Sequence, residues 1–249
     1  MRSAFDLDAL VIQHAEDNEL SKDGQVNDGI IATKLGLQGI PDYAEKIIIE
    51  RDLTLLEDFN CRYHIAQISS EKSVEIIKNR KEIVKFTTGV SINNLSLNQN
   101  DIGDFRTFLK LSPPLRTEDD RLSLIKGINQ NLIDVIVSDH KPEDEESKRL
   151  TFSQAATGAS GIETLLPLAL ELFHNGSIKL NKIIECLTNN PAKILKIDKG
   201  SLSVGSDADL CIVDIYKPWV VKKEKMISKS KNTCIEAVSY THLTLPTKA

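Results

Sequence analysis

The sequence lacks several features that would assign it to a common class of protein. No run in its 249 residues approaches the roughly 18 consecutive apolar residues that cross a bilayer. Its first residues carry one Arg and then two acids, without the basic start and apolar core of a signal peptide. The four cysteines show no CxxC spacing. These absences favour a soluble cytoplasmic protein whose thiols stay reduced.

Charge of one sign is not in marked excess either. The chain has 31 Lys and Arg against 36 Asp and Glu, which gives a formal net charge of −5. A mildly acidic chain has no electrostatic reason to bind nucleic acid or an anionic membrane. A lysine-rich stretch at residues 222–231 is local and typical of a solvated surface. We therefore expect a small-molecule partner, with no nucleic acid and no membrane.

A glycine-rich phosphate turn after the first apolar run is also missing, which argues against a Rossmann-type sheet. What the chain does contain is an alternation of short apolar runs, rich in β-branched residues, with helical patterns. The runs lie at residues 9–14, 63–69, 83–91 and 134–140, and the helical patterns at residues 43–59, 70–81, 117–129 and 161–176. Ser70 and Thr117 open two of these patterns and are expected to cap the helices. This alternation predicts an α/β fold with a parallel sheet.

Polar side chains stand where these runs end, namely His14, Gln67, Ser91 and Asp139. Barrel enzymes build their sites at the carboxyl ends of several strands, so we favour a TIM-like barrel over a doubly wound open sheet. A closed barrel needs eight strands, and only four βα units are present. The chain therefore reads as the C-terminal half of a (β/α)8 barrel. A fragment is favoured over a half-barrel that closes as a homo-oligomer.

Three parts are expected along the chain. Residues 1–197 form the partial barrel and end in a helix broken at Pro191. Residues 198–237 are rich in turn formers and predict part of a small flanking β module, with a strand at residues 209–215. The tail "VSYTHLTLPTKA" at residues 238–249 fits nothing before it and is interpreted as non-native, so His242 receives no role.

Two strand-end residues are the main candidates for chemistry. His14 is followed by Glu16 and Asp17, and an imidazole beside carboxylates suits a divalent metal; the alternative is a loop His bonded to its neighbours. Asp139 could bind a metal with one oxygen and accept a proton with the other. The alternative for Asp139 is a helix cap or turn former.

Three further residues carry weaker signals. His64 precedes the strand-end Gln67 by three residues, so we expect it to point to the opposite side as a structural His. Arg116 follows a diproline and could clamp a substrate carboxylate, or pair with an acid at residues 118–120. His174 lies near a helix end, where a surface role is expected.

Several stretches, in order over residues 5–233, together resemble the dihydroorotases, of the larger type within the metal-dependent amidohydrolase superfamily. They are "QHAEDNEL", "KLGLQGIPDYAEKIIIERDLTLL", "YHIAQISSEKSVEIIK", "LSPPLR", "SDHKPEDEESKR", "GIETLLPLALEL", "NPAKIL" and "GSLSVGSDADLCIVD". The stretch "GVSINNLSLNQNDIGDFRTFLKLSPPLR" is most similar to the alphaproteobacterial branch.

The resemblance implies a zinc hydrolase that reversibly cyclises N-carbamoyl-L-aspartate to L-dihydroorotate in pyrimidine biosynthesis. It implies a TIM-like barrel with one or two zinc ions. His14 would be a zinc ligand, and Asp139 both a zinc ligand and the catalytic acid/base. Thr157 and Gly158 would lie against the substrate, as would Ser112, which stands where the family has Asn.

The departures from the family pattern leave a second reading open. Gln67 stands at a family His position, Asn93 and Asn94 replace a His pair, and Glu143 replaces a substrate-binding His. The usual His-x-His pair would lie before Met1. Some relatives have lost catalysis and persist as structural partners of aspartate transcarbamoylase. Two hypotheses therefore stand: a dihydroorotase, inactive as this truncated chain, or a non-catalytic scaffold for that transcarbamoylase.

Overall fold

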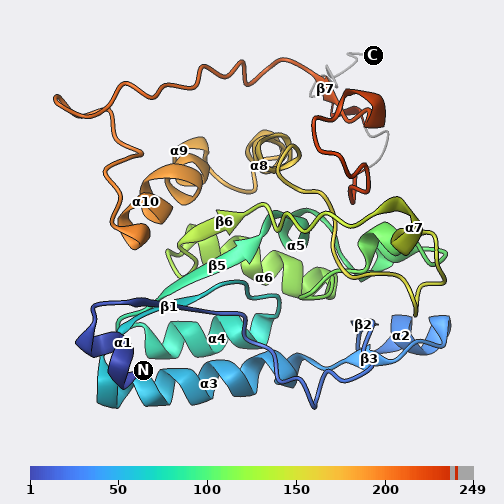
Figure 1. The fold of residues 1–249 in the computed structure, drawn as a ribbon, viewed down its shortest axis with the longest axis horizontal. Helices are drawn as coiled ribbons and strands as arrows, with labels where there is room; N and C mark the ends of the chain where they lie inside the picture. Colours follow the sequence, from blue (N-terminus) through green and yellow to red (C-terminus); the bar gives the residue numbers. More distant parts are fainter. Residues whose placement is uncertain (236–238, 241–249) are drawn as a thin grey trace, which may run out of the picture.

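The computed structural model describes residues 1–235 and 239–240. Its centre is a four-stranded parallel sheet in the order β1-β4-β5-β6 (Figure 1). The strands are β1 (Leu10–Gln13), β4 (Arg62–Ile65), β5 (Thr87–Ser91) and β6 (Val135–Val137). All four apolar runs of the sequence thus form the expected strands, and each strand is shorter than its run. The sequence prediction of a parallel α/β sheet is confirmed.

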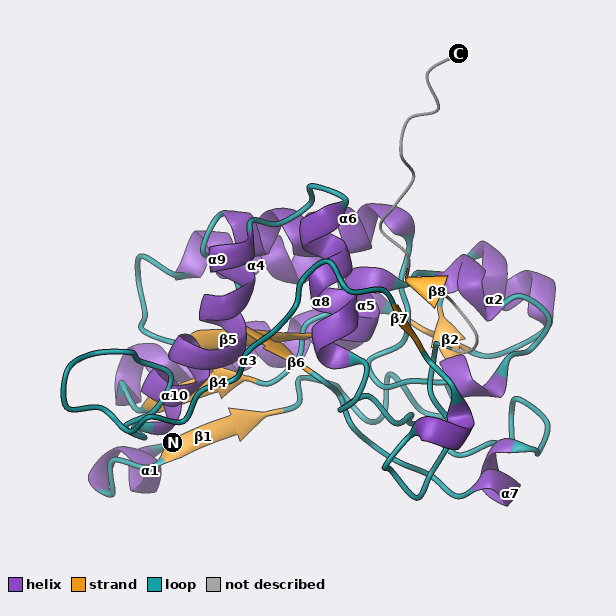
Figure 2. Cartoon of the chain, turned by 90° about the horizontal axis from the view of Figure 1, so that it is seen from above, coloured by secondary structure: helices purple, strands orange, loops and turns teal. Residues whose placement is uncertain are grey.

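Helices follow each strand, as expected for βα units. The longer ones are α3 (Asp42–Phe59), α4 (Glu71–Arg80), α6 (Glu118–Asn129) and α8 (Leu165–His174). Figure 1 shows α3 and α4 along one side of the strands, with α8, α9 (Leu180–Ile184) and α10 (Asn190–Leu195) toward the other. Seen from above in Figure 2, β1 lies at one margin of the sheet. All four carboxyl ends therefore share one edge of the sheet.

Shorter elements connect these units. They are α1 (Arg2–Asp6), β2 (Val26–Asn27), α2 (Ile30–Leu35), β3 (Gly39–Ile40), α5 (Ile92–Ser96) and α7 (Glu145–Lys148). Single 3-10 turns occupy Gln99–Ile102, Thr107–Leu109 and Lys223–Lys225. Strands β2 and β3 pair in parallel beside α2 and form a small second sheet. This small sheet matters for the site because Asn27 and Ile40 reach Arg116 from it.

Two helix starts confirm the capping predicted from sequence. The Ser70 hydroxyl accepts the backbone N–H of Ser73 at 3.2 Å at the start of α4. The Thr117 hydroxyl accepts the N–H of Asp120 at 3.2 Å, and the Asp120 carboxylate accepts the N–H of Thr117 at 3.1 Å. Such a reciprocal box satisfies donors that the first helical turn leaves unpaired, and each cap is worth about 1 kcal/mol.

The core lies between the sheet and its helices. Ile49 and Leu53 of α3, Ile65 of β4 and Ile77 of α4 are all fully buried. Burying such a side chain contributes roughly 1.5–3 kcal/mol relative to leaving it in water. The core therefore holds α3 and α4 against the strands and sets the positions at which the strands end.

The helix expected to break at Pro191 continues through a π-helical segment. After α9 the chain forms this segment at Glu185–Asn189 and then enters α10, with Pro191 in its first turn. Proline has no N–H and is tolerated at the start of a helix, where that donor has no partner. The interruption thus precedes Pro191.

The strand expected at residues 209–215 does not form. That stretch pairs with no other strand within the described residues, and Leu210 and Ile212 are 67% and 98% exposed. A single strand without a neighbour leaves its backbone groups to water, so its alternating pattern does not suffice. The proposed domain division at residues 197 and 237 stays a prediction.

The interpretation of residues 238–249 as a non-native tail falls largely outside the described residues, including His242. The exception is β8 (Ser239–Tyr240), which pairs antiparallel with β7 (Trp219–Val220). Among the residues that the structure describes, no helix combines the length and apolarity needed to cross a membrane.

Candidate site at the carboxyl ends of the strands

Asp139 stands two residues after the end of β6, in the left-handed region of backbone space with φ of +49°. A non-glycine residue seldom adopts this conformation, which costs roughly 1–3 kcal/mol and is common at functional sites. Gln67 Nε2 donates to Asp139 Oδ1 at 2.9 Å, and Ser91 Oγ donates to Oδ2 at 3.4 Å. These three residues, here the Asp139 cluster, come from the ends of β4, β5 and β6.

His14 follows β1 and forms a second group, here the His14 cluster, with Glu16 and Ser112. His14 Nε2 lies 3.0 Å from Glu16 Oε2 and 3.1 Å from Ser112 Oγ, and Ser112 Oγ donates to Glu16 Oε2 at 3.0 Å. Both interpretations of His14 from the sequence therefore stay open. It is hydrogen-bonded to a neighbour, as a loop His would be, and it stands at a strand end, as a metal ligand would. Ser112 reaches it from 98 residues away.

The electrostatics of the His14 cluster favour an ion pair. The hydrogen bond to Glu16 raises the pKa of His14 above its usual value, and the charge of Asp139 adds to this. The same bond lowers the pKa of Glu16 to about 2. Because Asp139 contributes to the pKa of His14, the two clusters share one electrostatic environment.

The loop with Thr157 and Gly158 runs beside the residues that follow Asp139. Ala159 forms a parallel bridge with His140, and Lys141 N donates to Ala159 O at 2.9 Å. Gly158 has φ of +135°, and a Cβ there would lie 2.7 Å from Lys141 O. Only glycine allows this close approach of the two backbones. The structure therefore brings Thr157 and Gly158 next to the Asp139 loop.

His140 has a defined ring orientation that the sequence did not reveal. The backbone N–H groups of Gly161 and Ile162 donate to His140 Nδ1 at 3.2 and 3.3 Å. Because N–H groups only donate, Nδ1 must carry a lone pair, which places the proton of a neutral ring on Nε2. His140 thus presents an N–H donor beside Asp139.

The orientation expected for His64 is wrong, whereas its burial and its hydrogen bond to Thr87 agree with the expected structural role. A cavity of about 430 Å³ is lined by His64, Gln67, Asp139 and His140 together with apolar residues, so His64 and Gln67 face the same space. Alternation of side chains holds only within a strand, and β4 ends at Ile65. His64 Nδ1 lies 2.8 Å from Thr87 Oγ1, and burial lowers the pKa of His64.

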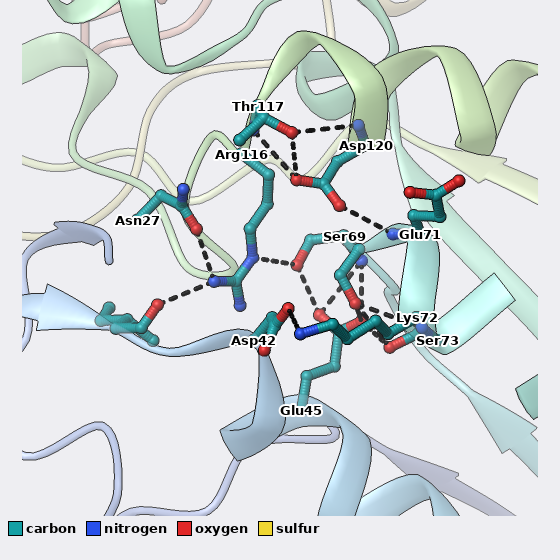
Figure 3. Close-up of polar contacts among 12 residues, drawn as sticks. Asn27, Asp42, Glu45, Ser69, Glu71, Lys72, Ser73, Arg116, Thr117 and Asp120 are labelled. Atoms are coloured by element: carbon teal, nitrogen blue, oxygen red, sulfur yellow. Dashed lines mark hydrogen bonds and ion pairs between the residues drawn. The ribbon is translucent and has the colours of Figure 1, made fainter. Parts of the chain in front are cut away.

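Arg116 fulfils neither alternative proposed from the sequence. It is buried, and it donates to Ser69 Oγ at 3.0 Å, Asn27 Oδ1 at 2.8 Å and Ile40 O at 2.7 Å (Figure 3). Ser69 Oγ in turn donates to the buried Glu45 at 2.5 Å. Of the acids expected as partners at residues 118–120, Glu118 pairs with Arg121 and Asp120 bonds to Thr117.

We call this group the Arg116 network: Arg116, Asn27, Ser69, Glu45 and Ser73. The Ser69 N–H and the Ser73 hydroxyl also donate to Glu45, at the entrance to α4. The network connects the small sheet, α3, the end of β4 and the loop that carries Ser112. It therefore positions site residues without lining the site.

The positions that depart from the family pattern have structural partners. Asn94 Nδ2 donates to Pro114 O at 2.9 Å and so holds the diproline loop, while Asn94 Oδ1 and Asn93 Nδ2 are buried without a partner among the residues that the structure describes. The Glu143 carbonyl accepts from Ser230 Oγ and Asn232 Nδ2, both at 2.7 Å.

His174 is hydrogen-bonded to the Ile215 carbonyl at 2.8 Å, against the expected surface role.

A zinc ion requires about four ligands in tetrahedral geometry, three of them from protein in catalytic sites. Among the described residues, no group of three or more His, Cys, Asp or Glu side chains is placed to hold a metal. Gln67 Nε2 already donates an N–H to Asp139 Oδ1, and a donor at that oxygen disfavours a cation there. His14 and Asp139 of this chain therefore do not fit a zinc site by themselves.

With this geometry established, the chain can be assigned: it belongs to the amidohydrolase family, whose model matches residues 1–239. The family consists of hydrolases, and the α/β fold is a partial TIM-like barrel. The family also implies a metal cofactor.

Individual relatives narrow the comparison. The chain is 44% identical over 229 residues to a dihydroorotase of Ehrlichia canis, which covers 91% of this chain and 51% of the relative. It is 42% identical to a dihydroorotase of Thermoanaerobacter sp., and the match covers 91% of this chain and 53% of that relative. The L-hydantoinase of Arthrobacter aurescens has a TM-score of 0.82 at 26% identity and covers 96% and 55%. The chain thus spans about half the length of the relatives it matches.

Proposed function

We propose that this chain is part of a dihydroorotase, a hydrolase that opens L-dihydroorotate to N-carbamoyl-L-aspartate and reverses the reaction in pyrimidine biosynthesis. The observation that carries the proposal is the convergence of the Asp139 and His14 clusters at the carboxyl ends of parallel strands. Barrel enzymes place their catalytic groups at this edge. A cytoplasmic location is part of the proposal.

In the proposed reaction Asp139 moves the proton. Ring opening adds water across the amide C–N bond, and a carboxylate that takes a proton from water can deliver it to the departing nitrogen. Within the described part of the chain, Asp139 Oδ2 has only the long 3.4 Å contact from Ser91, so this oxygen is the better acceptor. Thr157, Gly158 and Ser112 would contact the substrate from the loops beside it.

The proposal includes zinc, as one or two ions, for the complete protein. His14 and Asp139 supply too few ligands, so further ligands must come from outside the described residues. We therefore assign no catalytic step of this chain to the metal.

A second candidate is a non-catalytic scaffold that binds aspartate transcarbamoylase. The bond from Gln67 Nε2 to Asp139 Oδ1 favours it, because an amide N–H occupies the oxygen that would remain for a metal ion once Oδ2 accepts the proton. Such a protein would keep the fold and the strand-end contacts while losing turnover.

The test compares this chain with the full-length protein. We expect no dihydroorotate hydrolysis by the chain alone, with or without added Zn²⁺. We expect turnover by the full-length protein, and a loss of roughly 10²–10⁴-fold on Asp139→Asn, because general acid–base catalysis contributes that much. Asp119→Asn is the matched control, since Asp119 is exposed on α6.

Two results would contradict the dihydroorotase proposal. One is a full-length protein that shows no turnover, whether or not it binds zinc. Co-purification of that protein with aspartate transcarbamoylase would then support the scaffold. The other is turnover that Asp139→Asn leaves unchanged. Turnover by the chain alone that disappears on Asp139→Asn would overturn the expected inactivity.

A further inference from the structure

A second cavity lies at the opposite end of the sheet, where β1, β4 and β5 begin and α10 ends, toward the left of Figure 1. Its volume is about 660 Å³, within the range of small-molecule sites. It shares a single lining residue, Ile194, with the cavity beside Asp139, and no residue of the Asp139 or His14 cluster lines it. It therefore needs an explanation separate from the proposed hydrolase site.

The lining of this cavity is strongly basic. Five of its residues are cationic and none is Asp or Glu, although the whole chain carries a net charge of −5. The cationic residues are Arg62, Lys81, Lys85, Lys193 and Lys196. Opposite charges neutralise two of them, because Lys81 pairs with Asp134 and Lys196 with Asp8.

The other three cationic side chains make no ion pair within the described residues. In the same part of the chain, the Arg62 guanidinium donates to the backbone carbonyls of Asp8 and Ile194. Lys85 and Lys193 make no side-chain hydrogen bond or ion pair within the described part of the chain. Because these three side chains line one concave surface, they concentrate positive potential where an anion can enter.

The floor of the cavity is apolar and rigid. Val84 and Phe86 are 9% and 8% exposed, so they belong to the core and present only small surfaces to the cavity. The Tyr63 hydroxyl donates to Asp52 Oδ2 at 2.6 Å, which holds the Tyr63 ring in place. A ligand would therefore meet the small apolar surfaces of Val84 and Phe86 on one side and cationic groups at the rim.

We propose that this cavity binds a nucleotide, with its phosphates on Arg62, Lys85 and Lys193 and its base against Val84 and Phe86. Several adjacent negative charges match the three uncompensated cations, and guanidinium and ammonium groups are the usual phosphate partners. A planar base matches the apolar floor. The overall acidic charge of the chain disfavours a long polyanion such as nucleic acid.

The experiment measures binding of ADP to the purified chain by calorimetry at low salt. We expect saturable binding that weakens about tenfold or more in the double variant Lys85→Ala/Lys193→Ala, since two phosphate contacts are removed. Both lysines are exposed, so the fold should survive, and circular dichroism checks this. Lys78→Ala/Lys126→Ala is the matched control, with two exposed lysines removed elsewhere, and should bind like the original chain.

Pyrophosphate is the second probe and tests the apolar floor. We expect ADP to bind more tightly than pyrophosphate, because only ADP places a base on Val84 and Phe86. Equal affinities would refute the nucleotide assignment. Absence of ADP binding, an unchanged affinity in Lys85→Ala/Lys193→Ala, or an equal loss in the control variant would each overturn the site.

Discussion

The Arg116 network and the Asp139 cluster share one segment of chain, because Ser69 and Gln67 are two residues apart. The two groups nevertheless differ in burial. Arg116, Ser69 and Glu45 are at most 3% exposed, and several donors and acceptors meet at short distances. Asp139 and Gln67 are only half-buried, and His14 of the neighbouring cluster is exposed. One region excludes water, and the other is open to it.

This difference separates support from chemistry. A buried charge must have all its hydrogen bonds satisfied, so the Arg116 network has little freedom and holds the surrounding loops in one arrangement. A half-buried carboxylate at a strand end can still exchange partners with a ligand. Arg116 therefore positions the surrounding loops, and Asp139 is the residue that we propose contacts the substrate.

The largest effect is expected for Arg116→Met. This change removes the donor to Asn27 Oδ1 and to Ser69 Oγ in a site closed to water, while Ile40 O keeps only the N–H of Asp28. Removing one member of a buried charged network typically costs about 3–5 kcal/mol. The measurement is the free energy of unfolding in urea.

Arg149→Met is the control for that change. Arg149 and Glu145 are each 73% exposed and form an i,i+4 pair, which should contribute less than about 1 kcal/mol. If Arg116→Met destabilised the chain no more than Arg149→Met, the description of the Arg116 network as a rigid support would be wrong.

A smaller effect is expected for Gln67→Ala. It removes one hydrogen bond, 2.9 Å long, to the half-buried Asp139, and water can replace the lost donor. The expected loss is about 0.5–1.5 kcal/mol in the same urea experiment. A loss as large as that of Arg116→Met would contradict the contrast between the two regions.

The smallest effect is expected for the pH dependence of the free energy of unfolding. The raised pKa of His14 stabilises the fold below the unfolded value of 6.5, and this contribution is lost as pH rises through the folded value. The pKa of Glu16, lowered to about 2, stabilises the fold above 4.5, and this contribution is lost as pH falls. The ion pair of His14 and Glu16 therefore stabilises the fold most between pH 4.5 and pH 6.5, the two unfolded pKa values.

Glu16→Gln tests this coupling. It should lower the pKa of His14 toward its usual value, as measured by NMR titration of the imidazole ring. The fall in stability between about pH 5.5 and about pH 8.5 should be smaller in the variant than in the original chain. An unchanged pKa of His14 would show that the bond to Glu16 does not form in solution.

Local signals in the sequence predicted much of this protein. Short apolar runs gave four strands, and Ser70 and Thr117 gave two helix starts, because these patterns depend on residues within one or two turns. The strand-end positions of His14 and Asp139 followed from the same patterns. The strand at residues 209–215 failed because a strand requires a neighbour, and local pattern does not supply one.

Partners distant in sequence required the tertiary structure. Ser112 reaches His14 across 98 residues, and Arg116 reaches Asn27 across 89. The neighbouring residues suggested that Arg116 clamps a substrate carboxylate or pairs with an acid. Its burial instead makes it a support between the small sheet and the end of β4.

The sequence by itself determined the parallel α/β architecture, the strand ends and the two polar residues placed there, since hydrophobic periodicity and capping act locally. The tertiary structure alone decided that Gln67 bonds to Asp139, that His64 shares their cavity and that a basic cavity forms at the other end of the sheet. These features depend on burial and on the meeting of distant segments, which no local pattern encodes.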